Sequence, residues 1–241
     1  MKKILLFASI LLIAGTTSAQ SVKGLFDKVS SAVKQPSGSG LSNDEIISGL
    51  KEALNVGTSN TSSQLSKVDG YFANTAIKIL MPEAAKKMEK TLRNFGMGSV
   101  VDKAILSMNR AAEDAASGIG NIFFDAIKGM SIQDGLQILR GGDFAATDYL
   151  KKGTTAQLTE KFRPVIEASL VKVDATRYWK DVFTTYNKFS KSPVNTDLTA
   201  YVTERALAGL FYNIGLEEQK IRKDPAAQVT NILKKVFGSK I

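Results

Sequence analysis

A row of polar side chains beside an apolar stripe is the first feature of this sequence that could form a site. Asn109 and Glu113 follow Ile105 by four and eight residues, so a helix would place both at the edge of its buried face. Such a row could line a pocket. We favour the plainer alternative, in which these side chains satisfy buried backbone groups or pair with an arginine of a neighbouring helix.

A second group of charged residues surrounds a pair of glycines in the stretch Arg140-Gly141-Gly142-Asp143. Glycines would let the backbone approach a ligand or another helix closely. Asp134 and Asp143 could share a cation, but two carboxylates are too few for a calcium cage and Arg140 competes for them. We therefore expect helix capping and a salt bridge here, and no metal site.

Two adjacent glutamates lie within a long pattern of apolar residues near the C-terminus. At least one of Glu217 and Glu218 must share the face that buries Ile214. A buried carboxylate must find a partner or take up a proton, because an unpaired charge costs several kcal/mol. A surface pair of Glu218 with Arg222, four residues later, would solve the problem locally.

The alternative for these glutamates is a cluster at the centre of the fold. In this hypothesis Glu217 crosses the core and pairs with an arginine from another segment, and any chemistry on a ligand would occur there. The arginines that could take this role are Arg110, Arg140 and Arg163.

The residue types that the chain lacks narrow its chemistry further. It contains no histidine and no cysteine, which excludes Ser-His-Asp and Cys-His mechanisms, zinc sites, disulfides and lipidation of a cysteine. Carboxylates, lysine, tyrosine, serine and threonine remain available, but no motif indicates catalysis by them. We expect no cofactor, and a protein that binds or scaffolds rather than an enzyme.

The N-terminus has the three parts of a secretory signal. Lys2 and Lys3 precede an apolar run over residues 4–14, and small residues at 17–19 offer a cleavage site before Gln20. The run is about half of the roughly 20 residues that span a membrane. We predict a signal peptide over residues 1–19 and a periplasmic or otherwise exported chain without a transmembrane segment.

Residues 20–40 are expected to form an amphipathic arm and a flexible linker. Apolar residues of 22–34 share one helical face, and glycine, serine and proline dominate 35–40. The net charge of +9 becomes +7 without the two signal lysines. The arm could dock on an anionic envelope surface or on another envelope protein, or fold back on its own domain.

Nucleic acid is excluded as a partner, because no nucleic-acid-binding motif accompanies the charge.

The remaining residues, 41–241, show helical spacing throughout and no alternation typical of strands. The expected helix starts are marked by capping residues, namely Ser42 with Glu45, Pro82, Ser131, Asp143 and Asp224 with Pro225. The pattern predicts an all-α fold: one domain that is a compact multi-helix bundle of roughly ten helices, preceded by the amphipathic arm.

Several short stretches carry a more specific signal. They are Ser107-Met108-Asn109-Arg110-Ala111-Ala112-Glu113, Arg140-Gly141-Gly142-Asp143 with Ala145-Ala146-Thr147, Phe162-Arg163-Pro164, Tyr201-Val202-Thr203, Glu217-Glu218 with 221–227, and 233–238. Together they resemble the uncharacterised bacterial family catalogued as domain of unknown function 4197, over nearly all of 41–238. The resemblance implies an exported all-α protein, and it brings no activity, cofactor or catalytic residue.

These observations lead us to expect a non-enzymatic binding or scaffolding protein of the cell envelope. Two alternatives stay open: a carrier that encloses a lipid or other apolar ligand, and a carboxylate-dependent hydrolase of cell-wall polymers. A large apolar cavity would favour the carrier. An open cleft with two carboxyl groups about 5 to 9.5 Å apart would favour the hydrolase. The absence of both features would favour the scaffold.

Overall fold

The computed structural model describes residues 42–188, 193 and 195–224. They belong to the second of the two units into which the chain divides, residues 41–241. The predicted signal peptide, the amphipathic arm and the helix expected after Pro225 lie outside the described residues.

The described residues are mainly helical and contain no strand. The α-helices are α2 (Asn43–Leu65), α3 (Lys86–Asn94), α4 (Gly98–Ala115), α5 (Gly120–Lys128), α6 (Ile132–Arg140), α7 (Ala145–Val171), α8 (Ala175–Asn187) and α9 (Leu198–Lys223). Two 3-10 turns, η1 (Glu83–Ala85) and η2 (Ala116–Gly118), precede α3 and α5. The all-α prediction is confirmed, with eight α-helices in this part of the chain where roughly ten were expected for the whole. None of these helices is long and apolar enough to span a membrane.

Two helix starts follow the predicted capping chemistry. Ser42 accepts a hydrogen bond from the backbone N–H of Glu45, whose side chain accepts one from the N–H of Ser42. Ser131 and Asp134 form the same reciprocal pair at the start of α6. These hydrogen bonds to Ser131 lower the pKa of Asp134, so that the charged carboxylate stays at the positive end of the helix.

Two helices are longer than their local sequence indicates. α2 continues through a Ser/Thr-rich stretch to Leu65, because Gly57, Thr61 and Leu65 are buried along it and packing outweighs weak helix propensity. α7 runs through Pro164 as one helix of 27 residues, so this proline does not mark the start of a helix, which was one interpretation of its place in the sequence. The carbonyl of Glu160, which loses its partner at Pro164, lies on an exposed turn where water can satisfy it.

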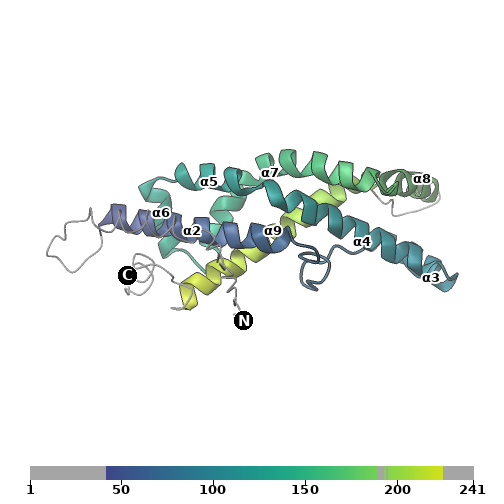
Figure 1. Ribbon diagram of the computed structural model, residues 1–241, viewed down its shortest axis with the longest axis horizontal. Helices are drawn as coiled ribbons and strands as arrows, with labels where there is room; N and C mark the ends of the chain where they lie inside the picture. The colour runs from purple at the N-terminus through teal and green to yellow at the C-terminus, as the bar shows by residue number, and fades with distance from the viewer. Residues whose placement is uncertain (1–41, 189–192, 194, 225–241) are drawn as a thin grey trace, which may run out of the picture. The chain divides into compact units, whose positions relative to one another are not determined.

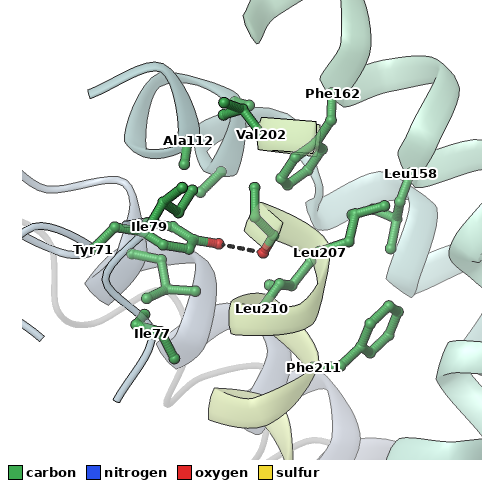
Figure 2. Packing of buried hydrophobic residues seen from close by; sticks show 14 of the residues in the cluster. Tyr71, Ile77, Ile79, Ala112, Leu158, Phe162, Val202, Leu207, Leu210 and Phe211 are labelled. Carbon is green, nitrogen blue, oxygen red and sulfur yellow. Dashed lines mark hydrogen bonds between the residues drawn. The ribbon is translucent and has the colours of Figure 1, made fainter. Parts of the chain in front are cut away.

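The core of this unit forms around α9, which packs against α7 and α2, while α4 packs mainly against α7 (Figure 1). The segment between α2 and η1 is irregular, yet it contributes Tyr71, which is completely buried. The Tyr71 hydroxyl donates a hydrogen bond of 2.8 Å to the carbonyl oxygen of Ala206 on α9 (Figure 2). Burial, reinforced by the nearby Glu113 carboxylate, raises the pKa of Tyr71, which therefore stays protonated and remains a donor.

Candidate functional site

Asn109 uses its whole side chain to hold the irregular segment before η1. Its Oδ1 accepts from the backbone N–H of Ile79 at 2.8 Å, and its Nδ2 donates to the carbonyl of Ile79 at 2.8 Å and to that of Ile105 at 2.7 Å. The residue is fully buried. The side chain thus satisfies both backbone groups of Ile79. This is the role that we favoured for Asn109, in which it satisfies buried backbone groups rather than lining a pocket.

Glu113, one helical turn later on α4, holds the preceding turn of the same segment. Its Oε1 accepts from the backbone N–H groups of Tyr71 and Phe72, at 3.0 and 3.1 Å. Arg110 pairs with its other oxygen at 2.5 Å and bridges to Asp69 at 2.7 Å. Asp69 has a positive φ of 70°, and this ion pair helps to hold that less favoured backbone conformation. The arginine comes from α4 itself, and not from a neighbouring helix as predicted.

Glu218 forms a second buried carboxylate site, at the start of α7. Its two oxygens accept from the backbone N–H groups of Ala146 and Thr147, at 3.0 and 2.8 Å, and from the Thr147 hydroxyl at 2.7 Å. Arg222 pairs with Glu218 at 2.8 Å and also donates to the carbonyl oxygen of Ile138 at 2.9 Å. The predicted Glu218–Arg222 pair exists, but it is buried rather than superficial: the two side chains are 6% and 14% exposed.

The hypothesis of a central cluster around Glu217 is wrong. Glu217 lies at the edge of the core, with 19% of its side chain exposed; it accepts from Asn60 at 3.1 Å and lies 3.8 Å from Lys220. None of the three proposed arginines reaches it: Arg110 is bound to Asp69 and Glu113, and Arg163 pairs with Asp197 at 2.8 Å. The physical reason is that the phase of α9 buries the next residue, Glu218, against the backbone N–H groups of α7.

Asp143 does not cap α7, contrary to prediction. The N-terminal residue before that helix is Phe144, which offers no side-chain cap, and Glu218 from α9 takes the role. Asp143 instead forms a salt bridge of 2.5 Å with Lys223 at the exposed end of α9. Arg140 is exposed and has no partner in the described part of the chain. The expected salt bridge of Asp143 therefore exists, with a lysine in place of Arg140.

A small cavity adjoins the Glu218 site, between α2 and α9. It has a volume of about 20 Å³, enough for roughly one water molecule. Its walls are mainly apolar, including Leu50, Leu54 and Ile214, and the Glu218 carboxylate closes one side. A lipid chain would not fit in a space of this size.

A larger groove lies between α2 and α5 and was not anticipated from the sequence. We call it the α2–α5 groove; it encloses about 350 Å³ and is lined by Asn55, Thr58, Ser59, Ser62, Ser63, Ser117, Gly120, Asn121 and Phe124. None of these residues is charged. The only sequence signal was the helical spacing of the five lining residues of α2, which are Asn55, Thr58, Ser59, Ser62 and Ser63.

The side chains of the groove divide into two groups. Thr58 and Ser62 donate to the backbone carbonyls of Leu54 and Ala116, at 2.8 and 2.9 Å. Asn55, Ser59, Ser63 and Asn121 have side chains without a hydrogen-bond partner in the described part of the chain, and are therefore available to a ligand. Phe124 is 52% exposed beside them.

The family model described as "protein of unknown function (DUF4197)" matches residues 40–238, most of the chain. The chain belongs to this family. Comparisons with curated proteins and with solved structures gave no match. Two of the stretches that carry the DUF4197 resemblance, 107–113 and 217–227, contain the two buried glutamates and their arginines. In this DUF4197 protein the two glutamates and their arginines therefore have a structural role, because they bind backbone N–H groups of other segments.

Proposed function

We propose that this DUF4197 protein is exported to the cell envelope and acts there by binding or scaffolding, without catalysis. The observation that supports this proposal best is the α2–α5 groove, whose described lining is uncharged and combines hydroxyl and amide side chains with the exposed ring of Phe124. At about 350 Å³, it lies at the lower end of the volumes typical of small-molecule sites.

The other two functions have less support in the described part of the chain. A carrier of apolar molecules would need a large apolar cavity, whereas the space between α2 and α9 measures about 20 Å³. A carboxylate-dependent hydrolase would need two acids facing each other across a cleft, and the α2–α5 groove has no carboxylate in its lining. Glu113 and Glu218, the buried glutamates, are engaged by backbone N–H groups and an arginine each.

The chemistry of the groove favours a neutral ligand that is rich in hydroxyl and amide groups. Asn55, Ser59 and Asn121 offer both donors and acceptors, while the exposed ring of Phe124 offers an apolar face. A sugar ring has matching surfaces, with hydroxyls at its rim and C–H bonds on its faces. A cell-wall glycan is thus the ligand class that we propose.

A titration with chitotetraose, a soluble oligomer of N-acetylglucosamine, tests this proposal by NMR of the labelled protein. We expect shifts of the amide signals of α2 and α5, and their loss in Ser63→Arg, which places a long cationic side chain in the groove. Gln157→Arg, an equally exposed change on α7, should leave the shifts unchanged. Equal shifts in both variants, or none in the wild type, would contradict the glycan proposal.

Export is tested separately, by fractionating cells and sequencing the N-terminus of the protein. We expect periplasmic material that begins at Gln20, because the signal pattern ends at residue 19. Recovery of the protein in the cytoplasm with Lys2 still present would rule out this part of the proposal.

A further inference from the structure

Three apolar side chains are exposed where α3 turns into α4. We call residues 95–100 the α3–α4 tip; in it Phe95, Met97 and Val100 are 77%, 42% and 59% exposed. Gly96, with a positive φ of 78°, makes the turn between them. Exposed aromatic and aliphatic residues that follow one another so closely indicate a contact surface rather than scattered surface apolar residues.

The packing of α3 explains why these side chains remain outside the core. No residue of α3 is buried, and only Met88 and Leu92 pack partly against the core. The helix ends at Asn94, so Phe95 does not continue the stripe of Met88 and Leu92. In Figure 1, α3 and the start of α4 lie at one end of the helices of this unit.

Basic residues flank the tip along the chain, and the two acids nearest to it in the sequence, Glu89 and Asp102, are already paired. Arg93 binds both Glu89 and Asp102, at 3.0 and 2.8 Å, which neutralises much of their charge. The lysines closest to the tip in the sequence, Lys87, Lys90 and Lys103, are exposed and have no ion pair in the described part of the chain. Lys103 follows Val100 by three residues and therefore lies about one helical turn behind it.

We propose that the α3–α4 tip docks this protein on an anionic phospholipid surface. Phe95, Met97 and Val100 would enter the interfacial layer, and Lys103, together with the exposed lysines of α3, would bind the lipid phosphates. Apolar insertion and basic residues are the two contributions that together give reversible membrane binding. The inference is independent of glycan binding, because the tip shares no residue with the α2–α5 groove.

Vesicle flotation tests the proposal with the full chain after removal of residues 1–19. The predicted amphipathic arm could also bind lipid, so each variant is made in a Phe26→Glu background, which weakens the apolar face of the arm. We expect this background protein to float with vesicles of equal parts phosphatidylglycerol and phosphatidylcholine, and far less with phosphatidylcholine alone. Added salt should release it.

Phe95→Glu should then lower the apparent affinity for the anionic vesicles at least tenfold, and Lys90→Glu should lower it severalfold. Tyr212→Glu is the matched control, an aromatic residue of α9 that is 48% exposed, and its affinity should not change. Unchanged flotation of Phe95→Glu would overturn the proposal. So would gel filtration that shows a dimer dissociated by Phe95→Glu together with no flotation, since the tip would then be a protein interface.

Discussion

The carboxylate of Glu218, near the end of α9, accepts a hydrogen bond of 2.8 Å from the backbone N–H of Thr147, in the first turn of α7. A helix normally obtains this hydrogen bond from the residue just before it. In α7 the acceptor comes from a residue 71 positions away in the sequence. The cap of one helix is thus also the contact that joins it to another.

Glu218→Ala should lower the free energy of unfolding by about 3 kcal/mol or more, because it leaves the Arg222 charge and the N–H groups of Ala146 and Thr147 buried without an acceptor. Urea unfolding measures the change. Glu217→Ala is the control, and it should cost about 1 kcal/mol or less, because its partners Asn60 and Lys220 are exposed and water can replace the carboxylate. Equal effects of the two substitutions would contradict this assignment.

Asn109→Ala should destabilise the protein by about 1 to 3 kcal/mol, since the N–H and carbonyl of Ile79 lose their partners in a buried place. Hydrogen exchange should show the amide of Ile79 losing its protection. Asn60→Ala, which removes an exposed amide, serves as the comparison and should leave that protection intact.

Two glycine substitutions should have opposite effects on thermal stability. A Cβ at Gly209 would lie 2.8 Å from Cε1 of Tyr71 and 3.1 Å from Cβ of Ile77, so Gly209→Ala should cost about 1 to 3 kcal/mol. Gly153, inside α7, has no atom within 4 Å of the added Cβ. Gly153→Ala should therefore stabilise the helix by about 0.5 to 1 kcal/mol. Calorimetry measures both changes: a Gly209→Ala protein as stable as the wild type would contradict the close contacts at Gly209, and a destabilised Gly153→Ala protein would contradict the open space at Gly153.

In the Asp197→Asn variant, the free energy of unfolding should fall less between neutral and acidic pH than it does in the wild type. The pKa of Asp197 is lowered from its ordinary value of 3.8, and the largest cause is the hydrogen bond that Arg163 donates to its carboxylate. A group with a lowered folded pKa stabilises the protein above its unfolded pKa, and this contribution is lost as the pH falls through the folded value. Asparagine cannot titrate, but can still accept from the N–H of Ala200 at the start of α9. Urea unfolding from about pH 5 to about pH 3 should show a smaller decline in the variant; parallel curves would contradict the assignment.

The features that could be predicted from the sequence depend on near neighbours in the chain. The capping box of Ser42 with Glu45 and the cap at Ser131 were predicted and are present, and the structure adds Asp134 as the reciprocal partner of Ser131. The backbone role of Asn109 also followed from its place beside an apolar stripe. The all-α fold class was predicted in the same way, because helical spacing of apolar residues is also a local pattern.

The errors arose where the partner is distant in sequence. Glu217 and Glu218 are three and four residues after Ile214, so either could share its face, and the backbone of α7 decides between them. Asp143 has a residue type and position that suit a cap, but Lys223 binds it instead. The α2–α5 groove likewise requires the packing of two helices that the chain separates, which no local pattern specifies.

The Glu218 cap has a consequence for the order in which the molecule can fold. The start of α7 cannot obtain its acceptor until Glu218, close to the end of α9, has been synthesised. A nascent or truncated chain that ends before residue 218 leaves those N–H groups open and the facing apolar side chains uncovered. Native stability should then appear late in synthesis and cooperatively, as contacts between distant parts of a chain require.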